Sequence, residues 1–122
     1  MCLTINPKHK HFGLYIAKRA KRDIVVYKIL RVIEGTSSYR EYQYKKGYNY
    51  PEKRGPIIQT NSEIGEGFLH ALTAKPSAEL HYYFYPYEMI VKMIIPKGAW
   101  YFLGISQFFG VQDVCATCLR YD

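Results

Sequence analysis

The chain has 122 residues, of which 48% are hydrophobic and 22% are charged. It is therefore long enough for one domain with one core, and too apolar for a disordered tail. No stretch approaches the roughly 18 consecutive apolar residues of a membrane-spanning helix, and the early run FGLYIA is shorter than a signal-peptide core. We expect a cytoplasmic protein with a single domain, residues 1–122, and no membrane partner.

The net charge of +7 is concentrated at the start of the chain. Residues 1–31 contain eight lysines and arginines against Asp23 alone, whereas the rest of the chain contains nine basic and nine acidic side chains. Such a cluster attracts phosphates, nucleic acid or an acidic protein, and it equally suits a solvated face that keeps the protein soluble. In this basic N-terminal segment, residues 1–22, the residues predicted to bind an anion or nucleic acid are Lys18, Arg19, Lys21 and Arg22.

Residues 6–22 carry a mixed pattern. Leu14, Ala17 and Ala20 can share a helical stripe, but Gly13 weakens a helix, and a loop or a strand fits equally well. The next segment, DIVVYKILRVI, is rich in β-branched residues. It predicts a central strand over residues 23–33.

The rest of the chain reads mainly as strands. One short helix is predicted over residues 75–84, where Pro76 stands near the first turn and Glu79 follows three residues later. A Pro-Lys-Gly turn follows the strand that ends at residue 95. The sequence therefore predicts a compact α+β fold, with about six or seven mostly antiparallel strands and one or two short helices. The later strands are expected at 39–50, 57–60, 67–72, 88–95, 99–105 and 114–121.

From residue 65 onward, GFLHALT, a helix, IVKMIIPKGAWYFLGI, a loop and a last strand follow in order. This order resembles the C-terminal half of ADP-ribosyltransferase-like domains, with VVYKIL in the place of the family's first strand. The resemblance covers residues 24–33 and 65–121. It places Lys28 where the family carries an arginine for the nicotinamide dinucleotide, and it implies a cleft shaped for a nucleotide.

The last segment, GVQDVCATC, departs from that family. It offers Gln112 and Asp113 and no glutamate. The family needs this glutamate to bind the ribose and to stabilise an oxocarbenium-like transition state by its charge. The resemblance therefore implies binding without catalysis. In style the chain also resembles small proteins of gut bacteria and their phages.

Thirteen tyrosines are present, and nine of them fall in two clusters, residues 39–50 and 82–87. Tyrosine offers a ring for stacking and a hydroxyl for hydrogen bonding, so a cluster interleaved with Arg40 can hold bases and phosphates. Sheet packing or contacts in a homo-oligomer use the same residues. The tyrosines that we single out are Tyr42, Tyr44, Tyr82 and Tyr83.

Two further features have a structural and a functional interpretation. His70 shares a strand face with Phe68 and Leu72, so it is either a satisfied core residue or a wall of a cleft. Cys115 and Cys118 have C-x-x-C spacing, but in a strand they point to opposite faces, which favours packing over a metal site.

No Gly-rich phosphate loop, H-E-x-x-H, G-x-S-x-G or paired-carboxylate signature occurs. We predict a non-enzymatic binding protein for an anionic ligand, such as a nucleotide-derived signal held by a phage-type anti-defence protein, with no cofactor. The alternatives are a diverged ADP-ribosyltransferase-like enzyme, a nucleic-acid-binding protein that uses residues 1–22, and a structural or assembly protein. The predicted ligand-binding residues are Lys28, Arg40, Tyr42, Tyr44, His70, Tyr82 and Tyr83.

Overall fold

The computed structural model describes residues 3–31, 43–64, 66–74, 88–106 and 112–122. Within these ranges the chain forms thirteen strands and one short 3-10 turn, η1 (Pro7–His9). The strands are β1 (Leu3–Ile5), β2 (Lys10–His11), β3 (Leu14–Ile16), β4 (Lys18–Arg19), β5 (Ile24–Arg31), β6 (Gly47–Asn49), β7 (Ile58–Gln59), β8 (Glu63–Ile64), β9 (Leu69–Leu72), β10 (Glu88–Ile95), β11 (Trp100–Ser106), β12 (Gln112–Ala116) and β13 (Leu119–Tyr121).

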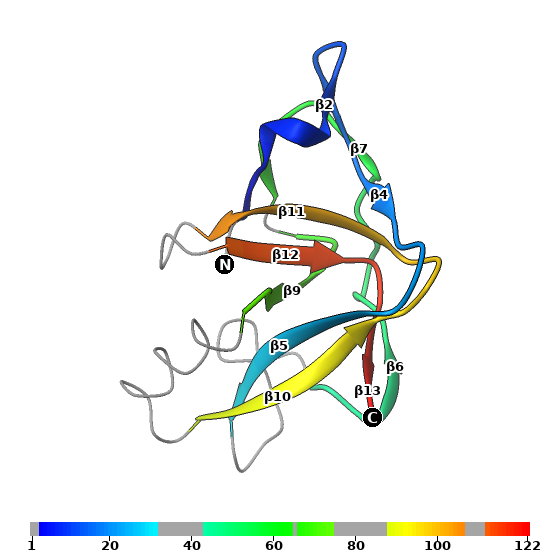
Figure 1. Ribbon diagram of the computed structural model, residues 1–122, viewed down its shortest axis with the longest axis vertical. Coiled ribbons are helices and arrows are strands. Elements are labelled where there is room, and N and C mark those ends of the chain that lie inside the picture. Colours follow the sequence, from blue (N-terminus) through cyan, green and yellow to red (C-terminus); the bar gives the residue numbers. More distant parts are fainter. Residues whose placement is uncertain (1–2, 32–42, 65, 75–87, 107–111) are drawn as a thin grey trace.

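Ten of these strands form one twisted antiparallel sheet (Figure 1). Its order is β6-β13-β10-β5-β9-β12-β11-β1-β8, and β4 pairs with β11 beside this path. The longest ladder joins β5 to β10 over eight residue pairs, from Ile24 opposite Ile95 to Arg31 opposite Glu88. Runs of Val, Ile and Leu favour both strands, since branched side chains pack well on a pleated surface.

The two faces of the large sheet bury separate apolar clusters. Along β12, Val114 and Ala116 belong to the larger cluster, whereas Cys115 between them belongs to a second one. Side chains alternate along a strand, so the two clusters lie on opposite faces. Completely buried residues at the centre of the larger cluster include Leu30, Met93, Ile95 and Leu119. The second is built around Leu3 and Phe102.

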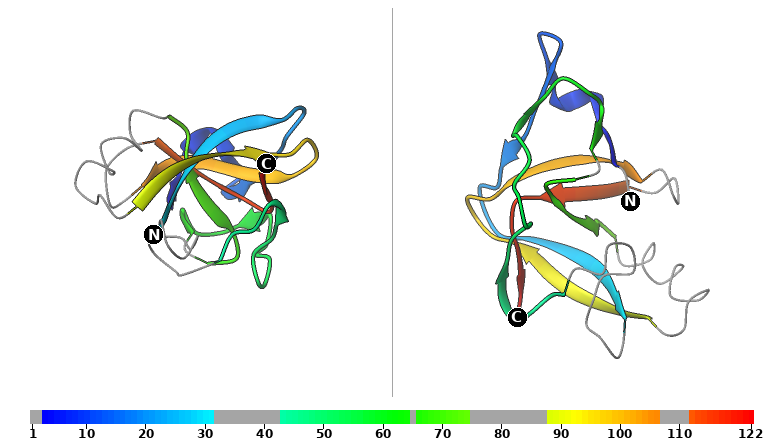
Figure 2. Two further views of the ribbon diagram at one scale, coloured as in Figure 1. Left: turned by 90° about the horizontal axis from the view of Figure 1, so that it is seen from below. Right: turned by 180° about the vertical axis from the view of Figure 1, so that it is seen from behind.

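A small three-stranded sheet, in the order β2-β3-β7, stands on the β11 side of the large one (Figures 1 and 2). In the β2–β3 hairpin, Lys10 pairs with Tyr15 and His11 pairs with Leu14, so the loop has two residues. Both loop residues have positive φ, 52° at Phe12 and 81° at Gly13, as a type I′ turn requires. For an L-residue such as Phe12 the left-handed conformation costs roughly 1–2 kcal/mol.

The predicted α+β class, with about six or seven strands, is wrong. The described residues form thirteen strands, and their only helical element is the three-residue turn η1. The difference begins in residues 6–22, where the helical stripe that we considered is replaced by η1, β2, β3 and β4. Gly13 is the reason, because it allows a tight reversal at which the chain pairs with itself instead of continuing as a helix. The helix predicted over residues 75–84 lies outside the described residues.

Most of the individual strands were predicted correctly, although the fold class was not. Those at 23–33, 88–95 and 99–105 are confirmed by β5, β10 and β11, and shorter strands, β7 and β9, form within 57–60 and 67–72. The strand at 114–121 is divided into β12 and β13. In the described part of 39–50, only Gly47–Asn49 forms a ladder.

Among the described residues, no helix has the length and apolar character needed to cross a membrane.

The close approach of β1 and β11 requires glycine at position 104. A Cβ placed on Gly104 would lie 2.1 Å from the carbonyl oxygen of Thr4. We expect Gly104→Ala to lower the free energy of unfolding by about 3 kcal/mol, the upper part of the usual range for an overpacked interior. Urea denaturation measures this change. Ile105→Ala, at an exposed position on the same strand, is the control, and equal stabilities of the two variants would contradict the expectation.

Candidate functional site

His9 is the polar residue that joins the small sheet to the large one. Its side chain is completely buried, with 0% exposure. The backbone N–H of Leu103 in β11 donates to its Nε2 at 3.1 Å, so this nitrogen carries no proton. Nδ1 therefore carries the proton and donates it to the carbonyl oxygen of Ile16 in β3 at 3.0 Å. The ring also packs on Phe102, with 5.5 Å between the ring centroids.

The surroundings of His9 favour its neutral form. Burial lowers its pKa from the ordinary value of 6.5, a hydrogen bond to Ile16 opposes this, and the positive charges of Lys18, Lys8 and His11 lower it further. The last contribution also carries geometric information. Lys8 and His11 are near the ring in the sequence, whereas Lys18 reaches its vicinity only through the fold.

Exposed basic side chains gather around the small sheet and its continuation into β4. Those of β2 and β4 are all exposed, as is that of the lysine in η1. In the part of the chain that the structure describes, none of them forms an ion pair. We call this group the basic lobe and define it as Lys8, Lys10, His11, Lys18 and Arg19.

Two cations of the basic lobe lie over aromatic rings. The Lys10 ammonium is 5.8 Å from the centre of the Tyr15 ring. The Arg19 guanidinium is 5.9 Å from that of the Trp100 ring, and its Nε donates to the carbonyl oxygen of Gly98 at 3.3 Å. Contacts of this length at an exposed site are weak. They nevertheless place positive charge directly beside ring surface.

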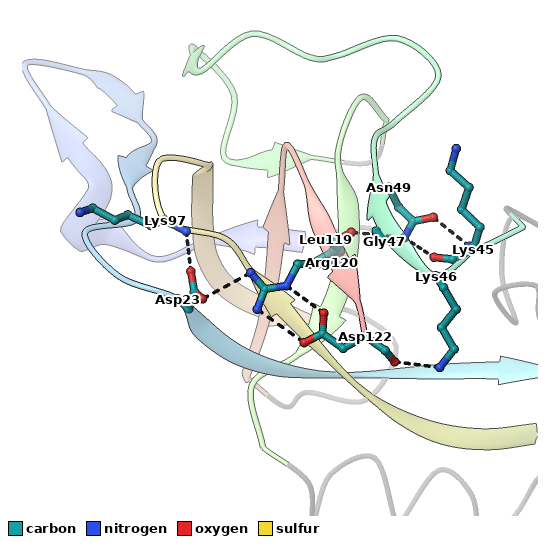
Figure 3. A network of polar contacts seen from close by, with 9 residues as sticks. All are labelled: Asp23, Lys45, Lys46, Gly47, Asn49, Lys97, Leu119, Arg120 and Asp122. Carbon is teal, nitrogen blue, oxygen red and sulfur yellow. Dashed lines mark hydrogen bonds and ion pairs between the residues drawn. The ribbon is translucent and has the colours of Figure 1, made fainter.

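Lys21 and Arg22 are also exposed and occupy the bend before β5. The acidic residue after them, Asp23, is engaged elsewhere (Figure 3). Its Oδ1 accepts a hydrogen bond from the backbone N–H of Lys97 at 2.9 Å, and its Oδ2 pairs with Arg120 at 3.4 Å. Its carboxylate therefore points toward Lys97 and Arg120, which Asp122 also contacts, and it forms no ion pair with a member of the basic lobe.

Three predicted ligand-binding residues converge at Lys28 inside the protein. Lys28 is a partly buried residue of β5. Its ammonium donates to the backbone carbonyl oxygen of His70 in β9 and lies 5.4 Å from the centre of the Tyr44 ring. Since β5 and β9 share a single paired position, Tyr27 opposite Leu72, this bond adds a side-chain link between the two strands.

Asp113 in β12 is a second buried ionisable group near enough to Lys28 for the two to affect each other's pKa. It is completely buried, and its Oδ1 accepts a hydrogen bond from the backbone N–H of Val114 at 2.8 Å. Its Oδ2 has no hydrogen-bond donor among the described residues. Burial raises the pKa of Asp113 to about 7, against the opposing effects of Val114 and Lys28. Burial likewise lowers the pKa of Lys28 to about 8, against the opposing charge of Asp113.

The predicted ligand-binding residues therefore have different outcomes. Lys28, Tyr44 and His70 come together, but His70 contributes its backbone carbonyl, and its side chain is buried. Sequence reasoning missed the partner, Asp113, although a single acidic residue inside the apolar run GVQDVCATC was a usable signal. The other predicted residues lie outside the described ranges: Arg40, Tyr42, Tyr82 and Tyr83.

The two described cysteines pack as predicted. Cys115 and Cys118 are free and buried, and they belong to the two different apolar clusters. Burial raises the pKa of both thiols. In the described ranges, no three His, Cys, Asp or Glu side chains are grouped so that they could hold a metal ion.

No family model, curated protein or solved structure matches this chain. The resemblance to ADP-ribosyltransferase-like domains therefore stays a prediction, and the function has to be argued from the geometry of the chain itself.

The hydrogen bonds of His9 predict a loss of stability in mild acid. The pKa of His9 is lowered on folding, so the unfolded chain takes up a proton first as the pH falls. Stability is then complete above the ordinary pKa of 6.5 and decreases below it. We expect His9→Gln to remove this part of the pH dependence between pH 7 and about 5. The melting temperature measured against pH tests this, with His11→Gln as the exposed control. A wild-type slope that survives in His9→Gln contradicts it.

Asp113 predicts a pH dependence of the opposite sign. Its folded-state pKa of about 7 exceeds the ordinary 3.8, so the folded chain holds a proton that the unfolded chain releases. Its contribution to stability therefore falls as the pH rises from about 4 to 7. We expect Asp113→Asn to gain stability relative to the wild type by on the order of 1 kcal/mol per pH unit in this window. Urea unfolding at pH 4.5 and pH 7 measures the gap, and a constant gap would contradict the expectation.

Proposed function

We propose that this chain is a non-enzymatic nucleic-acid-binding protein whose contact surface is the basic N-terminal segment. One observation carries the proposal. The exposed side chains of the basic lobe lie on η1 and on β2 of the small sheet, and on β4, which pairs with β11 of the large sheet, and they have no acidic partner among the described residues. Two of them lie beside aromatic rings: Lys10 beside Tyr15, and Arg19 beside Trp100.

Counterion release supports this assignment. Clustered lysines and arginines that neutralise phosphates release the condensed cations of a nucleic acid, and this provides affinity that does not depend on sequence. A mononucleotide offers few phosphates and so engages few of these side chains. A polymer engages many of them together, and a spread of separate exposed cations therefore suits it better.

The interior ionisable groups support binding without bond breaking. The ammonium of Lys28 contacts the carbonyl oxygen of His70, and both ring nitrogens of His9 are hydrogen-bonded to the backbone. A general base or a phosphate-binding cation must instead reach its substrate. These groups stabilise the sheets, and the cations of the basic lobe are those left for a ligand.

The proposal predicts salt-dependent binding that is lost stepwise with the lysines of the basic lobe. We expect fluorescence anisotropy with a labelled single-stranded oligonucleotide to give a linear fall of log affinity with log salt concentration. The double variant Lys10→Ala/Lys18→Ala should reduce the slope by about one unit per lysine.

Lys92→Ala is the matched control, since Lys92 is an exposed lysine of β10. It should leave both the affinity and the slope unchanged. No binding of any oligonucleotide at low salt, or an equal effect of all three lysine substitutions, would reject the proposal. A labelled mononucleotide, run in parallel, separates polymer binding from binding of a small nucleotide.

A further inference from the structure

Phe12 is an exposed aromatic residue at an unusual position. It forms the tip of the β2–β3 hairpin, which projects away from the large sheet (Figures 1 and 2). Its relative exposure is 105%, above every other exposed large hydrophobic side chain among the described residues. It therefore contributes nothing to either apolar cluster.

Neither packing nor the conformational preference of the turn explains why a phenylalanine stands at position 12. Its φ of 52° lies in the left-handed region, where Gly, Asn and Asp are far better tolerated than a bulky residue. A polar or flexible residue would fit this turn with less strain. Sparsely populated conformations of this kind concentrate at ligand-contacting positions.

The basic side chains around the tip suit a polyanionic ligand. Lys10 and His11 precede Phe12 directly and are exposed, and Lys8 is exposed at the base of the hairpin. A single ring among cations matches the alternation of base and phosphate along a nucleic-acid strand. A membrane surface is a poorer match, because one phenylalanine buries little apolar area in lipid compared with an amphipathic segment.

The anchoring of the hairpin adds to this argument. His9 fixes the base of the hairpin through its bonds to Ile16 and Leu103. The connection between Phe12 and this anchor is only two residues long. A ring presented on a short, fixed hairpin loses less conformational freedom on binding than one on a long loop.

We infer that Phe12 stacks on an unpaired base while Lys8, Lys10 and His11 contact the neighbouring phosphates, so that the chain prefers single-stranded over fully paired nucleic acid. This inference rests on the proposed function and deepens it. A base within a duplex is stacked on both faces, so its ring is not available to Phe12 without unstacking.

Phe12→Asn separates stacking from folding. Asparagine tolerates the left-handed conformation, so this variant should be at least as stable as the wild type by thermal denaturation. We expect its affinity for a single-stranded oligonucleotide to fall by about 5- to 150-fold, with little change for a hairpin-free duplex of the same sequence. Phe12→Trp should retain single-strand binding, and the emission of the new tryptophan should be quenched by the oligonucleotide, with the wild type giving the Trp100 background.

The outcomes distinguish this inference from the proposed function. If Phe12→Asn binds as tightly as the wild type while Lys10→Ala/Lys18→Ala binds more weakly, the stacking role is rejected and the proposed function stands. If the wild type binds neither nucleic acid, both are rejected. The stacking role is also rejected if Phe12→Asn weakens binding to phosphatidylserine vesicles and not to oligonucleotides, or if it dissociates a homo-oligomer seen by light scattering.

Discussion

The buried imidazole of His9 is the interaction on which the arrangement of the two sheets depends. It accepts a hydrogen bond from β11 and donates one to β3, so one neutral side chain satisfies a backbone group in each sheet. The contact with Phe102 extends this link into the second apolar cluster. A protonated ring could not accept from Leu103, and a buried polar group without its partner is costly. Protonation of His9 would therefore remove one of the hydrogen bonds that hold the base of the hairpin against β11, beside the backbone bond from Asn6 to Leu103.

The same residue connects stability with the charge of the surface. Lys8, Lys18 and His11 lower the pKa of His9, so the exposed cations that would attract a polyanion also help to keep the buried ring neutral. Positive charge clustered at one end of a small protein is normally unfavourable because like charges repel. Here part of that repulsion disfavours protonation of His9. It therefore favours the neutral imidazole, which is the form that accepts the hydrogen bond from Leu103.

The interior pair at Lys28 serves a different purpose from the basic lobe. Lys28 links β5 to β9, and Asp113 opposes part of the effect of its burial. Burial moves the pKa of each group toward neutrality, which shows that desolvation outweighs their mutual attraction. Lys28 was predicted to bind a ligand from the resemblance and Tyr44 from its tyrosine cluster, and their convergence has an internal structural explanation.

The sequence predicted the long strands and the surface charge, and it failed where local pattern carries too little information. β5 and β10 are eight residues each and rich in branched side chains, so their signal is strong. β2 and β4 have two residues each, which is too short for any period to be detected. β2 forms through its tight hairpin with β3, and β4 forms through pairing with the distant strand β11. The role of His9 was also hidden. It stands between two lysines in the sequence, and this local pattern suggests a solvent-exposed side chain. The exposure of Phe12 became visible only once the hairpin register was known.

The ends of the large sheet have a consequence for behaviour at high concentration. The outermost described strands are β6, with three residues, and β8, with two. An outer strand carries backbone groups that can recruit a strand from another molecule, and long, flat ones are a common start for fibrils. Outer strands of two or three residues offer such a template over only a short length of backbone. The short outer strands β6 and β8 therefore limit the addition of a foreign strand at these two ends of the described sheet.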